Sequence, residues 1–309
     1  MCIRDSLSNY TYHISSTVLL IVLSFYLNAL FQSVLSLSLI FTVGIVHGAN
    51  DLQLIQKHVG RSRPVFWRAL TIYIGVVFLG IFIFYYFPSF GLLAFVLFSA
   101  FHFGEQHFSR YFDPTVDSVY KTLVFVSYGL TIFGGLFYFQ WTEVHQVIFT
   151  IARVFVPPHF MGGVLLLSLV SFVLFCTWLP AVRKGLLVEL MILLLLFFLF
   201  HATNLLFAFA VYFIFWHSWP SMKDQMRFLY PHTSNALWLY LKSSFPYWLL
   251  SVIGLVLVYF LFDISAAHFL PLFFSFLAAI TFPHTVVMGW LKVSSHTSDG
   301  KADEVSSSF

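Results

Sequence analysis

The sequence predicts an all-α membrane protein, a bundle of about ten transmembrane helices with both termini in the cytoplasm. Of its 309 residues 60% are hydrophobic and only 9% are charged, and the mean hydropathy is +0.90. A soluble domain carries about 25% charged residues. The chain therefore has too few charges to cover a water-facing surface, and a membrane protein is the class that fits.

Ten apolar runs, each bounded by charged residues, Pro or Gly, divide the chain. A membrane span needs about 20 apolar residues, so each run predicts one helix. The run from Leu186 to His217 is too long for one span at about 1.5 Å per residue, and we divide it at residues 201–204; one long kinked helix is the alternative. The predicted helices cover residues 14–31, 34–54, 69–87, 90–108, 121–139, 160–180, 186–200, 204–220, 245–262 and 268–291.

The distribution of basic residues predicts which side of the membrane each loop faces, because cytoplasmic loops carry an excess of Lys and Arg. With ten spans and both termini inside, all but one of the 15 basic residues face the cytoplasm, and only Arg153 lies outside. A missed span would exchange the two sides for every later loop, so this asymmetry supports the helix count. The predicted cytoplasmic residues are Arg4, Lys57, Arg61, Arg63, Arg68, Arg110, Lys121, Arg183, Lys184, Lys223, Arg227, Lys242, Lys292 and Lys301.

Composition also bounds the domain organisation and the partners. We expect a non-native segment at residues 1–6, one membrane domain over residues 7–293 and a polar cytoplasmic tail over residues 294–309. The two cysteines, Cys2 and Cys176, lie far apart, so neither a disulfide framework nor a thiolate metal site is indicated. The net charge of +3 comes with basic residues spread over many loops, so nucleic-acid binding has no support.

Four of the 13 histidines share one predicted depth in the membrane. His47, His102, His217 and His284 each lie six to ten residues before a basic residue, in the inner part of an even-numbered helix. At the helical rise these imidazoles occupy one layer, roughly 9–15 Å from the cytoplasmic charges. Ionisable groups inside a membrane are costly and mark functional interiors. Four imidazoles at one depth therefore predict a metal site.

Carboxylates and small residues accompany these histidines. Asp51 lies four residues after the first of them and Glu105 three residues after the second, which places each carboxylate on the helix face of its own histidine. A metal-bound imidazole usually donates its other N–H to such a group, so we expect Asp51 and Glu105 to orient the ligands. Gly48, Ala49 and Gly104 predict that neighbouring helices approach closely.

Four short motifs surround the histidines. They are Val46-His47-Gly48-Ala49-Asn50-Asp51, Phe101-His102-Phe103-Gly104, the segment from Tyr212 to His217-Ser218, and Thr281-Phe282-Pro283-His284. In this order and spacing they resemble the PHGAxD, HFG, YFxxxHS and TxPH motifs of the Brp/Blh family of membrane β-carotene 15,15′-dioxygenases. The resemblance implies Fe(II), dioxygen as co-substrate, and an apolar carotenoid taken from the bilayer and cleaved to two molecules of retinal. It also implies a bacterial inner-membrane enzyme with product hand-off to a rhodopsin.

Two departures from the family pattern affect the ligand set. The HFG motif commonly continues to an aspartate where this chain has His107, and the family's HSxxH pair ends here in Ser221 instead of a second histidine. The ligands that the resemblance carries over are His47, His102 and His217. The fourth imidazole must come from elsewhere. His284 is favoured by its depth, and His107 is the reserve ligand, because five residues turn it about 140° around the helix from His102.

Two rival functions stay open on the sequence. A di-iron membrane hydroxylase or desaturase also uses histidines, but it needs closely spaced HxxxH and HxxHH boxes, and the sequence has neither. A haem-binding electron carrier would use transmembrane histidine pairs and would show a strong Soret band. The 41 Phe residues fit either lipid-facing and core packing or an aromatic-lined tunnel for a long, flat, apolar substrate.

Overall fold

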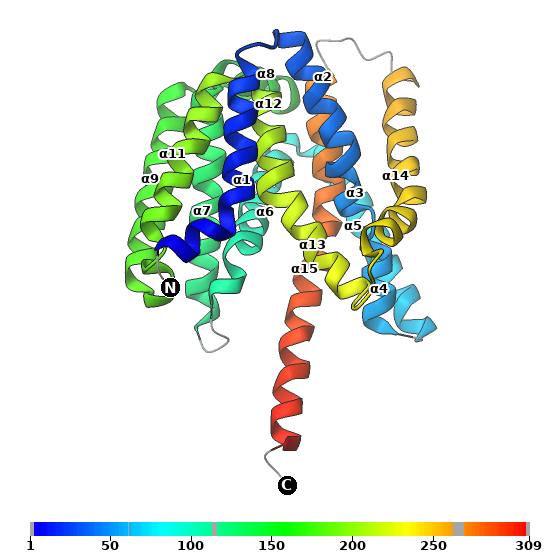
Figure 1. Cartoon of the computed structure of the whole chain (residues 1–309). Helices are drawn as coiled ribbons and strands as arrows, with labels where there is room; N and C mark the ends of the chain where they lie inside the picture. The colour runs from blue at the N-terminus through cyan, green and yellow to red at the C-terminus, as the bar shows by residue number, and fades with distance from the viewer. Residues whose placement is uncertain (1–2, 61, 113–115, 262–268, 307–309) are drawn as a thin grey trace.

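The computed structural model describes residues 3–60, 62–112, 116–261 and 269–306, and every regular element in these ranges is helical (Figure 1). The first elements are α1 (Ile3–Ser24), α2 (Ala29–Leu39), the π-helix η1 (Ile40–Gly44), α3 (Ile45–Gly48), α4 (Asp51–Val59), α5 (Arg63–Tyr86), α6 (Pro88–Phe108), the short 3₁₀-helix η2 (Ser109–Tyr111) and α7 (Ser118–Phe139). They are followed by α8 (Trp141–Ala152), α9 (Pro158–Trp178), α10 (Pro180–Arg183), α11 (Leu186–Ala202), α12 (Leu205–Val211), the π-helix η3 (Tyr212–Ser218), α13 (Trp219–Leu229), α14 (Ala236–Leu261) and α15 (Phe269–Ser306).

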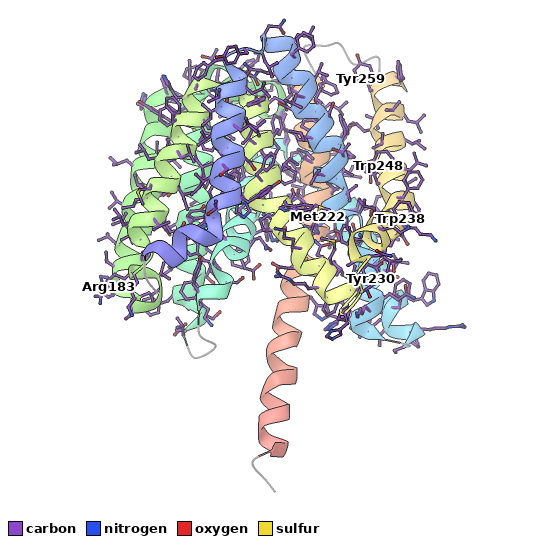
Figure 2. The ribbon with its side chains drawn as sticks, in the orientation of Figure 1. Arg183, Met222, Tyr230, Trp238, Trp248 and Tyr259 are labelled. Carbon is purple, nitrogen blue, oxygen red and sulfur yellow. The ribbon has the colours of Figure 1, made fainter. Side chains whose placement is uncertain are left out.

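Within the described ranges, eight helical segments are long and apolar enough to cross a membrane. Two shorter apolar helices, Tyr10–Ser24 and Leu186–Ala202, complete the ten apolar segments that the sequence predicts. The chain is therefore a multi-pass, all-α membrane protein. Large apolar side chains cover much of its outer surface, and Figure 2 shows the rings of Trp238, Trp248 and Tyr259 at successive heights along α14.

Both ends of the chain lie toward the lower side of the bundle in Figure 1, as an even number of spans requires. α15 continues as a helix to Ser306, through most of the segment expected as a polar tail. The side of the membrane that the two ends face stays a prediction from the basic residues.

The long apolar run that begins at Leu186 divides where the sequence predicts a break. α11 ends at Ala202 and α12 begins at Leu205. The side chain of Asn204 caps α12 by accepting a hydrogen bond from the backbone N–H of Phe207 at 2.9 Å, which satisfies one of the free donors at a helix start. The alternative of one continuous kinked helix is wrong.

α8 is a helix that the sequence does not predict, because it lies between two predicted spans. Its 12 residues are too few to span a bilayer, and it ends before Arg153, which has a left-handed backbone (φ 56°). Val144 and Val147 on α8 are buried, and the helix contacts both α6 and α15. α8 therefore covers the upper end of the bundle in Figure 1.

α6 and α7 approach so closely that each contributes a glycine to the contact. A Cβ atom placed on Gly104 would overlap the backbone carbonyl of Phe125, and one placed on Gly129 would overlap the carbonyl of Ala100. Small residues allow membrane helices to pack backbone against backbone in this way. The sequence predicts the close contact at Gly104, whereas the partner glycine on α7 was not identified.

Candidate metal centre

Four helical segments bring the predicted histidines to one place. His47 lies on α3, His102 on α6, His217 on η3 and His284 on α15, and each is at most 4% exposed. Their ring centroids form a closed circuit of 5.0 Å (His47–His217), 4.8 Å (His217–His102), 5.2 Å (His102–His284) and 4.4 Å (His284–His47). We call these four side chains the imidazole cluster.

Three members of the imidazole cluster place ring nitrogens close enough to approach one ion. One nitrogen from each of His47, His102 and His217 lies within 4.8 Å of the other two. Two imidazole nitrogens bound to one ion at about 2.1 Å are at most about 4.2 Å apart, so small ring movements complete the geometry. His284 lies outside this group of three nitrogens, although its ring neighbours those of His47 and His102.

Two buried nitrogens of the imidazole cluster are free to bind a ligand. Among the described residues, Nε2 of His47 and Nε2 of His284 have no hydrogen-bond partner. A buried polar atom left unpaired costs about 1–3 kcal/mol, and such atoms are rare in native proteins unless an ion or water binds them. Neutral imidazole nitrogens suit iron, zinc and copper, so the donor set fits a divalent transition metal.

Asp51 orients His284 and not His47. Its Oδ1 atom accepts a hydrogen bond from Nδ1 of His284 at 2.7 Å, and its Oδ2 atom accepts one from the Tyr73 hydroxyl at 3.4 Å. The sequence pairs Asp51 with His47, whereas its hydrogen-bond partner is His284, and the chain makes a turn at residues 49–50, between His47 and Asp51. The i+4 relation holds only inside a continuous helix. Tyr73, on α5, had no signal in the sequence.

The support of His47 comes from two residues that the sequence pattern does not single out. The amide nitrogen of Gln225 lies 3.4 Å from Nδ1 of His47 and donates to the His47 carbonyl oxygen at 3.2 Å. Tyr240 donates its hydroxyl to Oε1 of Gln225 at 2.8 Å. Gln225 lies among the charged residues of α13, and Tyr240 lies before the predicted start of its span, so neither appeared as an intramembrane polar residue.

Ser221, at the position of the family's second histidine, takes part in the same contacts. It is fully buried, and its hydroxyl oxygen accepts a hydrogen bond from Gln225 at 3.3 Å. Ser221 therefore holds the amide that touches His47 and does not supply an imidazole.

His107 belongs to a different polar cluster. Its Nε2 atom lies 2.9 Å from Oε2 of Glu189, and Tyr10 donates its hydroxyl to Oε1 of the same carboxylate at 3.0 Å. The rings of Tyr10 and Tyr128 each stack on the ring of His107, with centroid distances of 5.5 and 4.7 Å. The reserve ligand is thus engaged with Glu189, while His284 lies in the imidazole cluster.

Glu105 is half-buried on α6, close to one turn beyond His102. The expected role of Glu105 in orienting His102 stays a prediction.

Two π-helices shape the backbone beside the imidazole cluster, and no sequence pattern predicts either of them. η1 ends three residues before His47, and η3 contains His217. The two pack together where Gly44 faces Phe213, because a Cβ atom on Gly44 would lie only 2.8 Å from the phenyl ring. Short π-helical stretches occur frequently at functional sites. In η3 the carbonyl of Phe215 lies 2.6 Å from Nδ1 of His13.

The comparison with known families gave one match. The family model described as Beta-carotene 15,15'-dioxygenase matches residues 38–292, a range that contains the whole imidazole cluster. Neither a curated protein nor a solved structure matches the chain.

Proposed function

Because this chain belongs to the β-carotene 15,15′-dioxygenase family, whose activity is that of an oxygen-using oxidoreductase, we propose that it is an Fe(II) enzyme that cleaves β-carotene to retinal. The imidazole cluster, buried and drawn from four helical segments, carries this proposal. In the balanced reaction the central C=C bond breaks, and each of its carbons takes one oxygen atom of O2. Each half then ends in the aldehyde of one retinal.

The residues that would hold Fe(II) are His47, His102, His217 and His284. Four neutral imidazoles leave coordination positions open on an ion that prefers six ligands. When bound, the iron supplies the activation of O2 beside the polyene. The unpaired Nε2 atoms of His47 and His284 support this assignment, as does the hydrogen bond between His284 and Asp51.

The surrounding residues orient the imidazoles and exclude water. Asp51 fixes the ring of His284 through Nδ1, which leaves Nε2 to bind. The ring of Phe103 lies 4.2 Å from that of His217, and Phe213 stacks on the same imidazole at 5.7 Å. A hydrocarbon substrate has no polar group for the protein to bind, so apolar contact and shape must position it.

Expression in cells that make β-carotene tests the proposal. We expect the cells to bleach and to accumulate retinal, identified by chromatography of extracted pigments, and we expect His47→Ala to abolish both. His201→Ala is the matched control, because His201 is exposed at the end of α11. Unchanged β-carotene in cells that contain folded wild-type protein would refute the proposal.

The metal content separates this function from its rivals. We expect purified protein to bind about one iron per chain and to show no Soret band, because the imidazole cluster is one compact group. Two irons per chain would favour the di-iron oxygenases, and a Soret band would favour a haem protein.

The same proposal locates the enzyme in a bacterial inner membrane and includes hand-off of retinal to a rhodopsin. The multi-pass fold and the resemblance to the Brp/Blh family support it. Fractionation of the native host's membranes tests the location.

A further inference from the structure

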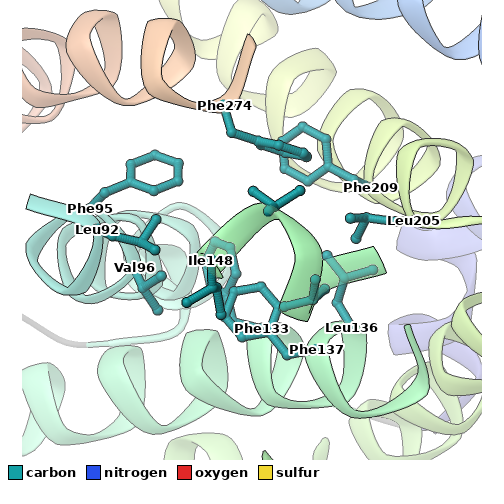
Figure 3. Close-up of a pocket in the computed structure, with 12 residues that line it drawn as sticks. Leu92, Phe95, Val96, Phe133, Leu136, Phe137, Ile148, Leu205, Phe209 and Phe274 are labelled. Atoms are coloured by element: carbon teal, nitrogen blue, oxygen red, sulfur yellow. The ribbon is translucent and has the colours of Figure 1, made fainter. Parts of the chain in front are cut away.

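A partly open apolar cavity lies between α6, α7, α8, α12 and α15 (Figure 3). The described residues that line it all have hydrocarbon side chains, and its volume is about 50 Å³. Phe209 and Phe274 lie on one side of it in Figure 3, and Phe133 and Phe137 lie on the other. No residue of the imidazole cluster lines the cavity, and the cavity has no role in the reaction proposed above.

Three of the helices that carry histidines also line this cavity. Val96 lies six residues before His102 on α6, and Phe274 lies ten residues before His284 on α15. On the third helix Phe209 lies eight residues before the histidine of η3. At about 1.5 Å per residue these separations are about 9–15 Å along the helices. The cavity therefore lies to one side of the imidazole cluster, at a distance comparable with one polyene half of a carotenoid.

Two stacks of phenyl rings connect the cavity with the imidazole cluster. Phe133, at the cavity, stacks on Phe103 at 5.5 Å, and Phe103 lies 4.2 Å from His217. Phe209, also at the cavity, stacks on Phe213 at 5.2 Å, and Phe213 stacks on His217 at 5.7 Å. An extended hydrocarbon that runs between the two places meets flat aromatic faces along its path.

We propose that this cavity is the subsite for the hydrocarbon end ring of one half of the carotenoid, and that it sets which double bond lies at the imidazole cluster. The inference rests on the proposed function for the identity of the substrate. A benzene-sized guest occupies an apolar cavity of about 150 Å³, so the lining phenyl rings rotate outward when the end ring enters. An apolar lining leaves a hydroxyl on the ring without a hydrogen-bond partner, and this disfavours hydroxylated carotenoids.

Filling the cavity from α8 tests the subsite. Val147 is buried, lines the cavity and lies on a helix without a member of the imidazole cluster. We expect Val147→Phe to lower kcat/KM for β-carotene at least about tenfold, as removal or blocking of an apolar contact does, while iron content and membrane insertion stay unchanged. Adding Ile148→Ala, which returns volume to the same cavity, should restore part of the rate. Val170→Phe on the outer face of α9, where Val170 is exposed, is the matched control.

A substrate comparison on the unmodified protein keeps the test independent of folding. We expect kcat/KM for β-carotene to exceed that for a carotenoid hydroxylated on both rings by about 10- to 100-fold. Equal values for the two carotenoids, or a wild-type rate in Val147→Phe, would overturn the subsite and leave the proposed function standing. Failure of wild-type protein to form any retinal would instead overturn the proposed function. In that case β-carotene that copurifies equally with wild-type protein and Val147→Phe would also overturn the subsite.

Discussion

The hydrogen bond between Asp51 and His284 gives a quantitative test of the metal centre. Asp51 is 1% exposed, and its Oδ1 atom lies 2.7 Å from Nδ1 of His284. A hydrogen bond to a charged group contributes about 1.5–3 kcal/mol, and a neutral one about 0.5–1.5 kcal/mol. Asp51→Asn keeps an acceptor oxygen of the same shape but loses the charge, so about 1–1.5 kcal/mol of support disappears.

If His284 binds the iron, that loss appears as weaker metal binding. Each 1.4 kcal/mol is about tenfold in an equilibrium constant, so we expect Asp51→Asn to raise the Kd for Fe(II) about tenfold. Asp51→Ala, which also leaves Nδ1–H buried without an acceptor, should approach the 100-fold end of the range seen for such supporting residues. Anaerobic titration of metal-free protein in detergent, in competition with a chelator, measures both values.

The chain contains a matched control for this experiment. Glu189 is a second buried carboxylate that contacts a histidine, His107, at 2.9 Å. Glu189→Gln makes the same chemical change away from the imidazole cluster, and we expect it to leave the Kd for Fe(II) within about twofold. Unchanged iron binding in Asp51→Asn, or an equal loss in Glu189→Gln, would show that His284 is not a ligand oriented by Asp51.

Three further predictions address the ligand set, the packing and the topology. His284→Ala should lose iron and retinal formation almost completely, whereas His107→Ala should retain a substantial part of both; the reverse ranking in folded protein would make His107 the ligand. Gly104→Ala should lower the yield of folded protein in size-exclusion chromatography, because the added Cβ overlaps backbone on α7 and overpacking costs at least about 1–3 kcal/mol; Gly75→Ala, which meets open space, should not. A reporter that is active only in the periplasm should stay inactive when fused after Lys292, and activity there would contradict the cytoplasmic C-terminus.

Much of the fold follows from local composition, because apolar length and breaker residues act over short segments. The break before Asn204 is an example, since a capping residue and the excess length of one apolar run both lie in the sequence. α8 shows the limit of this reasoning. Its apolar face is buried against α6 and α15, so its helical state depends on contacts that no local pattern reveals.

The imidazole cluster shows the same division. The depth of a residue in the membrane depends only on the helical rise, so the sequence alone predicts that the four histidines lie in one layer. The direction in which a side chain points around its helix cannot be predicted in the same way. The turn at residues 49–50 and the π-helices η1 and η3 each change the direction of the side chains that follow them. For this reason the sequence predicts Asp51 as a supporting carboxylate but pairs it with His47, whereas its hydrogen-bond partner is His284.

The glycine contacts between α6 and α7 determine which part of the centre is free to adjust. With Gly104 against Phe125 and Gly129 against Ala100, the two backbones interlock, and neither helix can slide along the other without collision. His102 lies two residues from Gly104, so its position is fixed by this pair. His47 follows the π-helix η1, His217 lies within the π-helix η3, and His284 lies on a helix that contains Pro283. We therefore expect His102 to move least of the four imidazoles if an ion binds to the imidazole cluster.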